Sequence, residues 1–373
     1  MGAAMKICLY SPYIPDHFGG GEKYLLDVAQ ILATKHQVYL AIASLQPLTD
    51  RAKAQLLSRY QQTFALDFSQ IKLIASPLGT SASFWTKLAW TKQFELLYYA
   101  TDGSLFFSRA KKNILHIQVP LQLDKSGLLE RLKLANWQIK NTNSYFTKQV
   151  IEQSWKTKID LVHQPMVQVE QFQLPVKKLT QKGQIILHVG RFFRQLHSKK
   201  QDVLVDIFRQ LTTRYPSKTK DWQLVLIGAV EDEQYAQKVR QKAKGLNVKI
   251  LHQLSRAELI AWYQRAKIYW HATGFGVNEH KNPEKVEHFG ISTVEAMAAG
   301  CAPIVISKGG QKEILGSELQ DWSWLAKKDC VNKTMRLIRE PQGLRQVQQQ
   351  AMQRAQVFNR QRFEQQLWAM VKE

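Results

Sequence analysis

Residues 6–43 read KICLYSPYIPDHFGGGEKYLLDVAQILATKHQVYLAIA. The apolar runs at 6–10 and 37–43 have the length of buried strands, and residues 22–34 between them have helical periodicity. Gly19, Gly20 and Gly21 predict a turn after the first strand. A strand, a helix and a second strand in this order predict a parallel sheet with crossover helices.

The same alternation of strand and helix signals recurs in the second half of the chain. Ser255 and Glu258 have the spacing of a capping box, which opens a helix. The other expected elements are strands at 185–189, 223–227, 248–251, 268–271 and 302–306, and helices at 202–214, 233–243 and 292–299. This pattern predicts an α/β protein of two Rossmann-like domains facing each other across a cleft.

The length of 373 residues favours two domains. Residues 168–184 are polar, contain Pro175 and lack either period, so we expect the hinge there. The predicted domains are residues 1–172 and 182–350. Residues 351–373 are expected to form a helix that packs back toward the first domain.

Composition excludes disorder and indicates an anionic partner. Hydrophobic residues make up 45% of the chain, and 52 Lys and Arg against 30 Asp and Glu give a formal charge of +22. A phosphate, a membrane surface or a nucleic acid would each suit that charge. Residues 1–175 carry +7 and residues 176–373 carry +15, so the excess is spread rather than gathered in a tail, which argues against a nucleic-acid partner.

Cys8, Cys301 and Cys330 lack a disulfide-like spacing, and the first two lie in or beside apolar runs, so we expect a reducing, cytoplasmic location. No signal peptide is apparent at the N-terminus, and no apolar run approaches about 18 residues. Any membrane contact is therefore expected to be peripheral.

Candidate ligand-binding residues follow two of the predicted strands. The glycines at 19–21 would let backbone amides approach a phosphate, although a plain turn is the alternative. They do not form GxGxxG, and no acidic residue ends the next strand, which argues against a nicotinamide enzyme. Gly190-Arg191 with Lys199 and Lys200 places fixed positive charge past a later strand, suited to a diphosphate or simply to solvent.

The most informative stretch runs from Glu287 to Gly300 and reads EHFGISTVEAMAAG. Glu287 would lie in a loop, and Glu295 about one turn into a helix whose start faces the same cleft. Two carboxylates at those depths could hold two sets of hydroxyls. Glutamates eight residues apart are also common by chance, so the surrounding motif carries the interpretation.

This stretch, with the following CAPIV run and Gly309-Gly310, resembles the signature of family-4 glycosyltransferases of the GT-B fold. The resemblance spans nearly the whole chain in the family's order. Its other motifs are YSP at 10–12 with the triple glycine, DGS at 102–104, NSYFT at 143–147 and VGR at 189–191 with Lys199. The form EHFGI at 287–291 is most similar to the branch of GDP-mannose-using mannosyltransferases.

The resemblance implies a role for each matching residue. Arg191 and Lys199, or Lys200 in its place, would bind the donor diphosphate, and Gly20 and Gly21 would close on it. Glu295 would bind the ribose and Glu287 the transferred sugar. The backbone amides of Phe289, Gly290 and Ile291 would lie beside that sugar or the phosphate.

The family also implies an enzyme that retains anomeric configuration and needs neither cofactor nor bound metal. We find no DxD motif and no His, Cys and Asp set at metal-ligand spacing. The donor would be GDP-mannose or a UDP-hexose. Leaving-group charge would be neutralised by Arg191, Lys199 and helix N-termini, and a phosphate oxygen would accept the acceptor's proton.

One position departs from the family pattern. Members of this branch often carry a histidine before an aromatic-Pro pair, where this chain has Gln118. His116, two residues earlier, would either contact the sugar or pack inside its strand. We interpret His271 and His288 as structural residues rather than as bases.

The resemblance places a glycan or lipid-linked acceptor in the first domain. Residues 84–94 and 128–140 combine aromatic or aliphatic side chains with lysines, as helices at an anionic membrane do, and also as helices packed on a sheet do. Two alternatives to a transferase are a catalytically weak GT-B-like protein that binds an anionic polymer and a sugar-nucleotide epimerase.

Overall fold

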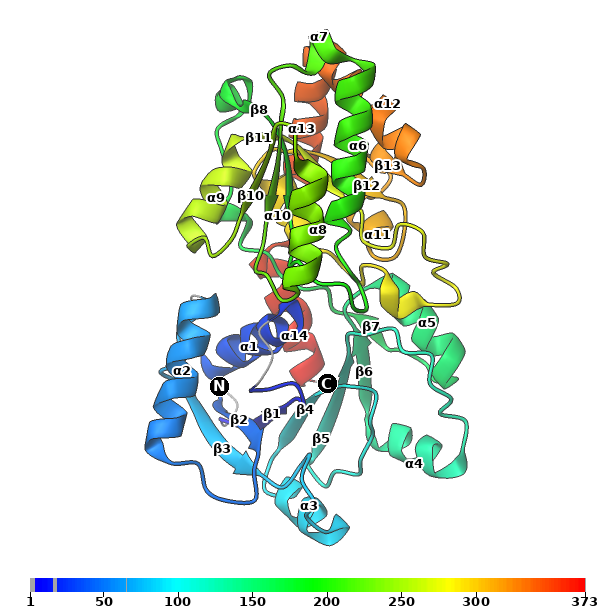
Figure 1. The fold of residues 1–373 in the computed structure, drawn as a ribbon. Coiled ribbons are helices and arrows are strands. Elements are labelled where there is room, and N and C mark those ends of the chain that lie inside the picture. The colour runs from blue at the N-terminus through cyan, green and yellow to red at the C-terminus, as the bar shows by residue number, and fades with distance from the viewer. Residues whose placement is uncertain (1–3, 16–18, 65, 373) are drawn as a thin grey trace. The chain divides into compact units, whose positions relative to one another are not determined.

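The computed structural model describes residues 4–15, 19–64 and 66–372 (Figure 1). The chain divides into two compact units, Met1–Gln164 with Glu364–Glu373, and Pro165–Phe363. Each unit is built around a parallel sheet with crossover helices, as the alternation of strand and helix signals predicts. The fold class is therefore the predicted α/β arrangement of two Rossmann-like units.

Within its described residues, the first unit holds a seven-stranded sheet in the order β3-β2-β1-β4-β5-β6-β7. Its strands pair in parallel throughout. The strands are β1 (Lys6–Tyr10), β2 (Gln37–Ala43), β3 (Ile71–Ser76), β4 (Leu96–Thr101), β5 (Lys112–Ile117), β6 (Ile139–Thr142) and β7 (Leu161–Val162). The helices are α1 (Gly20–Ala33), α2 (Asp50–Phe64), α3 (Phe84–Thr91), α4 (Leu128–Asn136) and α5 (Tyr145–Trp155).

Helix α1 begins earlier than the sequence predicts. The Glu22 carboxylate accepts the Gly19 N–H at 2.7 Å and so caps the helix, which starts at Gly20. Gly20 and Gly21 therefore form the first helical turn rather than a separate turn. Asp16, His17 and Phe18, which precede the glycines, lie outside the described residues.

The core of the first unit contains a buried polar network beside its apolar side chains. The Tyr24 hydroxyl lies 2.7 Å from the Tyr98 hydroxyl and 2.5 Å from His163 Nδ1. His116 stacks on Tyr24 with ring centroids 3.9 Å apart and hydrogen-bonds Asn141 through Nδ1. All five side chains are buried, so the network fixes β4, β5 and β6 around α1.

The helix predicted over residues 128–140 is wrong at its end. Helix α4 stops at Asn136, and Ile139 already pairs with Ile114 in the sheet. Trp137 between them is fully buried and lies 5.4 Å from the Tyr99 ring. Burial of this indole in the core turns the chain out of the helix and into β6.

The second unit, all of whose residues are described, holds a six-stranded parallel sheet in the order β10-β9-β8-β11-β12-β13. Helices α6, α8 and α12 pack together, and α10 packs with α9 and α13, which gives two helical layers (Figure 1). The strands are β8 (Gly183–Val189), β9 (Gln223–Ile227), β10 (Val248–Leu251), β11 (Ala266–His271), β12 (Ala302–Ile306) and β13 (Ser323–Trp324). The helices are α6 (Gln201–Arg214), α7 (Pro216–Thr219), α8 (Glu233–Ala243), α9 (Arg256–Arg265), α10 (Ile291–Ala298), α11 (Gln311–Leu315), α12 (Lys327–Arg339) and α13 (Pro341–Ala355).

The structure corrects the predicted hinge at residues 168–184. That segment contains two short 3-10 helices, and its Val169, Phe172 and Leu179 side chains are buried in the second unit. Val167 N–H also donates to Phe358 O at 2.8 Å. The units therefore divide at Gln164, before the expected end of the first domain at 172.

The C-terminal segment is two helices rather than one. α13 ends at Ala355, and α14 (Arg360–Lys372) follows after a 3-10 turn. From Glu364 onward the chain groups with the first unit. There Lys112 Nζ donates to Val371 O at 3.3 Å, and Lys35 Nζ lies 4.7 Å from the Trp368 ring.

Cys8, Cys301 and Cys330 are free and completely buried. Burial raises the pKa of all three thiols. Among the helices of the described residues, none has the length and hydropathy needed to cross a bilayer.

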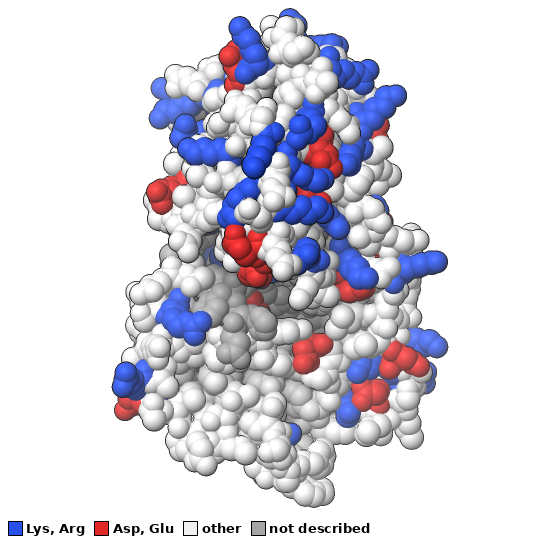
Figure 2. Space-filling model, viewed as in Figure 1, with Lys and Arg blue, Asp and Glu red and all other residues white. Residues whose placement is uncertain are grey.

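The positive charge is unevenly divided between the units. Residues 165–363 hold 32 Lys and Arg and 17 Asp and Glu, a formal charge of +15, while the rest of the chain carries +7. Figure 2 shows many basic side chains on the visible face of the second unit and few on that of the first. An anionic ligand is thus favoured most by the second unit.

Candidate functional site

The first group of site residues follows β8, at the edge of the sheet where ligands bind in open parallel folds. Gly190 N–H donates to Ile227 O at 2.8 Å, which joins the turn to β9. Arg191 comes next, with its guanidinium 4.9 Å from the Phe193 ring and Nη1 2.7 Å from Glu231 Oε1. Glu231 is a partner that the sequence analysis missed.

The second group joins the segment just before α6 to the EHFGI segment. Lys199 Nζ lies 2.6 Å from Glu287 Oε2, and both side chains are largely buried. His271 Nε2, at the end of β11, lies 2.9 Å from the same oxygen. Three segments far apart in sequence thus place an ammonium, a carboxylate and an imidazole in one cluster, which we call the Glu287 cluster.

Lys200 does not share this position. It has a left-handed backbone with φ of 57° at the start of α6, while Lys199 contacts Glu287. Of the two lysines, the structure therefore brings Lys199 to the Glu287 cluster.

The electrostatics of the cluster keep Glu287 ionised. Burial alone would raise its pKa, but the charge of Lys199 and the hydrogen bond from His271 bring that pKa well below its ordinary value. Burial lowers the pKa of His271 despite its contact with Glu287. Lys199 therefore carries the positive charge opposite Glu287 at neutral pH, and His271 is a neutral hydrogen-bond partner.

Three more histidines surround the cluster. Burial is the largest cause that lowers the pKa of His188 to about 3, of His197 to about 2 and of His288 to about 4. These imidazoles are neutral at pH 7, consistent with the interpretation of His288 as structural. His271, for the same reason, does not act as an acid in the resting protein.

Several buried polar atoms here have no hydrogen-bond partner among the described residues. They are His188 Nε2, His197 Nδ1, His271 Nδ1, Gln201 Oε1 and Thr273 Oγ1. Native proteins rarely leave buried polar atoms unpaired. These side chains therefore offer donors and acceptors that a polar ligand or water can use.

The lowered histidine pKa values predict acid sensitivity. Below about pH 6.5 the unfolded chain binds protons at these imidazoles while the folded chain does not, so the free energy of unfolding should fall between about pH 6.5 and 4. Each such imidazole contributes at most about 1.4 kcal/mol per pH unit. Urea unfolding at several pH values measures the slope.

A variant at His116 tests this explanation, because burial also lowers the pKa of His116 to about 3 and the residue can be replaced by one that does not titrate. A His116→Gln variant keeps a hydrogen-bonding side chain beside Asn141 but cannot titrate. Its stability should depend less steeply on pH than that of the wild type. An unchanged slope would contradict the assignment.

Glu295 lies apart from the Glu287 cluster in α10 and has its own partners. Its side chain accepts from Arg256 Nη1 at 2.8 Å and from the Tyr263 hydroxyl at 2.9 Å. The Arg256 guanidinium lies 4.8 Å from the Phe172 ring. The carboxylate is therefore held rigidly, with part of its acceptor capacity left for hydroxyls.

The turn before α10 depends on Gly290. Its φ of 121° favours glycine, and a Cβ atom there would lie 2.0 Å from Gln311 Nε2. Gln311 Nε2 donates to Phe289 O at 3.3 Å, while the Phe289 ring is buried against Phe358. The backbone N–H groups of residues 289–291 donate to no group among the described residues, as expected at a helix start.

In the first unit the structure places His116 in the interior rather than at a surface. The side chain is fully buried in the polar network of the core, which favours packing inside the strand over contact with a sugar. Gln118 is half-buried, and its Nε2 donates to Gly21 O at 3.1 Å. Gln118 is therefore the side chain that lies beside the glycine segment.

Comparison with known proteins agrees with these motifs. Residues 170–354 match the family model of the glycosyl transferases group 1. The second unit is a group 1 glycosyltransferase domain. The Glu287 cluster, Arg191 and Glu295 all lie within this glycosyltransferase domain.

A curated relative and several solved structures resemble this chain. The relative is the Neurospora crassa GDP-Man:Man(3)GlcNAc(2)-PP-Dol alpha-1,2-mannosyltransferase, 28% identical over 199 residues, which cover 46% of this chain and 33% of the relative. The match thus spans about a third of that relative's length.

Anabaena HepE in complex with UDP has a TM-score of 0.73 at 17% identity, over 99% of this chain and all of that one. Thermosynechococcus elongatus sucrose-phosphate synthase has a TM-score of 0.66 at 16% identity, over 98% of each chain. These likenesses show that this chain has the two-domain GT-B fold.

Proposed function

We propose that this chain is a retaining, metal-independent glycosyltransferase that moves a hexose, mannose in the first instance, from a nucleoside diphosphate to an acceptor hydroxyl. The observation that carries the proposal is the Glu287 cluster beside Arg191, in a domain of the group 1 family. It brings fixed positive charge and an ionised carboxylate, which can accept hydrogen bonds from hydroxyls, to one edge of the sheet. The name of the Neurospora relative supports GDP-mannose, and the UDP complex of HepE makes UDP-hexoses the alternative.

The proposed reaction exchanges one bond at the sugar C1 for another. The bond between the sugar C1 and the diphosphate oxygen breaks, and a bond from C1 to the acceptor oxygen forms on the same face. Arg191 and Lys199 neutralise the charge that grows on the diphosphate. The backbone N–H groups of residues 289–291, at the start of α10, donate hydrogen bonds to the sugar or to the phosphate. The acceptor's proton passes to a diphosphate oxygen, so no side chain serves as general base.

Glu287 and Glu295 hold the donor's hydroxyls in this scheme. Glu287, kept ionised by Lys199, accepts hydrogen bonds from the transferred sugar, and Glu295 accepts from the ribose. In this scheme Gly20, Gly21 and Gln118 are the residues of the first unit that contact the donor. The acceptor is a glycan or a lipid-linked sugar.

Donor screening tests this proposal. Purified protein is incubated with GDP-mannose, UDP-glucose, UDP-galactose and UDP-N-acetylglucosamine, with and without EDTA, and thermal stability and sugar release are followed. One donor should stabilise the protein and be hydrolysed slowly with retention, and Arg191→Ala combined with Glu295→Ala should lose both effects. Absence of any donor effect would overturn the proposal, and conversion of the donor to another nucleotide sugar would indicate an epimerase.

The proposal includes a peripheral contact of the first unit with an anionic membrane. Helix α3 exposes Phe84 and Trp85, and α4 exposes Leu128, Leu129 and Leu132. Figure 1 shows α3 and α4 at the same end of the first unit. Exposed aromatic and leucine side chains with nearby lysines suit insertion among lipid headgroups.

Vesicle binding tests that contact. We expect the wild type to sediment with vesicles of phosphatidylserine and phosphatidylcholine, and a Trp85→Ser, Leu128→Ser variant to bind about 100-fold less or weaker still, since each of the two apolar side chains contributes about 1.5–3 kcal/mol when buried and about 1.4 kcal/mol is tenfold. The matched control is Leu196→Ser, an exposed leucine of the second unit. Equal binding by all three proteins would contradict the assignment.

A further inference from the structure

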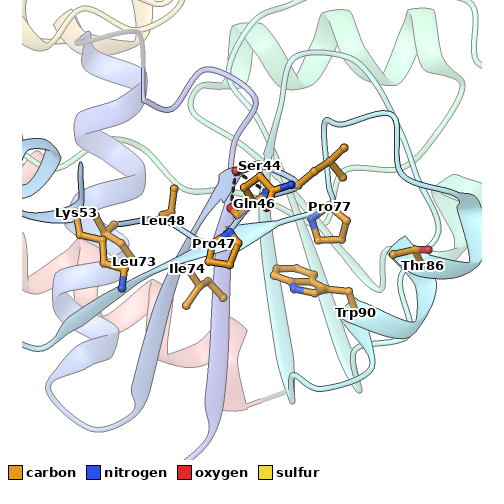
Figure 3. Close-up of a pocket in the computed structure, with 12 residues that line it drawn as sticks. Ser44, Gln46, Pro47, Leu48, Lys53, Leu73, Ile74, Pro77, Thr86 and Trp90 are labelled. Atoms are coloured by element: carbon orange, nitrogen blue, oxygen red, sulfur yellow. Dashed lines mark hydrogen bonds between the residues drawn. The ribbon is translucent and has the colours of Figure 1, made fainter. Parts of the chain in front are cut away.

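The first unit contains a pocket of about 460 Å³ that none of the site residues above lines (Figure 3). Its walls come from the segment after β2, from β3 and from α3. Ser44 directly follows β2 and Pro77 directly follows β3, so the pocket opens near the carboxyl ends of these strands. That is the edge of a parallel sheet where ligands bind.

The apolar part of the pocket is an aromatic wall. Trp90 is half-buried, and its ring is held edge-to-face on Phe94 with centroids 5.0 Å apart. Figure 3 shows the Trp90 side chain beside Pro47, Pro77 and Ile74. The indole is therefore fixed in place and leaves part of its surface free for a ligand.

Polar side chains line the pocket beside this wall. The Ser44 hydroxyl donates to Gln46 O at 2.7 Å and accepts the Gln46 N–H at 3.2 Å, which fixes the segment after β2. Gln46, Thr86 and Lys53 also line the pocket, and the Thr86 hydroxyl lies 2.8 Å from the Ser83 hydroxyl. Amide and hydroxyl side chains can both donate and accept hydrogen bonds, and an ammonium donates them.

We propose that this pocket holds a hexose ring of the acceptor, stacked on Trp90. A hexose combines an apolar C–H face with a rim of hydroxyls, which matches a pocket whose lining includes an indole and the polar residues Gln46, Thr86 and Lys53. The volume lies within the range of about 300–1,000 Å³ of small-molecule sites. This inference rests on the proposed transferase function.

Charge separates this site from the donor site. Arg191, Lys199 and their carboxylate partners all lie in the second unit, whereas the pocket has Lys53 alone among its lining residues as a charged group. Lys53 is also paired with Asp50 at 3.1 Å. A neutral sugar fits this environment better than a nucleoside diphosphate does.

Nuclear magnetic resonance of the Trp90 indole N–H in the full chain tests the proposal. Methyl α-D-mannopyranoside and methyl β-D-glucopyranoside serve as probes, with cyclohexanol as the apolar comparison. At least one glycoside should shift the Trp90 signal saturably in the millimolar range, while cyclohexanol should not. Trp90→Phe assigns the signal, and Trp85→Phe on the same helix is the matched control.

The outcomes separate this inference from the transferase proposal. Gln46→Ala with Thr86→Val, at exposed positions, should weaken glycoside binding at least threefold while leaving donor hydrolysis unchanged. If a donor is hydrolysed but neither glycoside shifts Trp90, or cyclohexanol shifts it equally, the hexose site is wrong and the transferase stands. If glycosides bind at Trp90 but no nucleotide sugar is used, the pocket stands as a sugar site and the transferase falls.

Discussion

Replacing Lys199 with methionine should reduce kcat/KM for sugar transfer by about 100- to 1,000-fold. The ammonium is the group that the structure places against Glu287, and in the proposed mechanism it also neutralises the departing diphosphate. Methionine keeps a side chain of similar length but removes the charge. Steady-state kinetics with the donor found by screening measures the loss.

Lys200 supplies the matched control, since it neighbours Lys199 without contacting Glu287. Lys200→Asn suits the left-handed backbone at that position and removes the same charge. We expect this variant to retain kcat/KM within about threefold. If the two variants lost activity equally, Lys199 would have no special role and the assignment would fail.

Replacing Glu287 with leucine should lower the free energy of unfolding by about 3–5 kcal/mol. The substitution leaves the Lys199 ammonium largely buried with no carboxylate opposite it, and breaking one side of a buried ion pair is costly. Urea unfolding of the variant and the wild type at pH 7.5 measures the difference.

A double variant separates stability from function. Lys199→Met combined with Glu287→Leu removes both charges, and replacing a buried pair by apolar side chains is often neutral. The double variant should therefore recover most of the lost stability while still failing to transfer sugar. A double variant as unstable as Glu287→Leu alone would show that the ion pair does not determine stability here.

Most strands were predictable from the sequence because parallel strands covered on both faces appear as unbroken apolar runs. The strands β1, β2, β9, β10 and β12 have their predicted bounds. The predicted helix end and the predicted hinge were wrong because burial of single side chains there does not follow the local sequence periodicity. Trp137 ends a helix by entering the core, and the polar segment at 168–184 is anchored by three buried side chains that are too widely spaced to show a period.

The roles of the candidate residues stay predictions, but the structure adds partners that sequence reasoning did not assign. Arg256 and Tyr263 meet Glu295, and Glu231 meets Arg191, from more than 30 residues away in each case. Those pairs depend on the order of the strands, which local pattern does not give. For His271 a signal existed, since it ends a predicted strand at the same edge as Gly190.

The complete burial of Cys8, Cys301 and Cys330 has a practical consequence for spectroscopy. Maleimide dyes react with accessible thiolates, so the native protein should take up almost no label. A single cysteine engineered on the surface of each unit would then be the only labelled positions, with no need to remove native residues. Energy transfer between two such dyes would report, molecule by molecule, how a nucleotide sugar changes the separation of the two units.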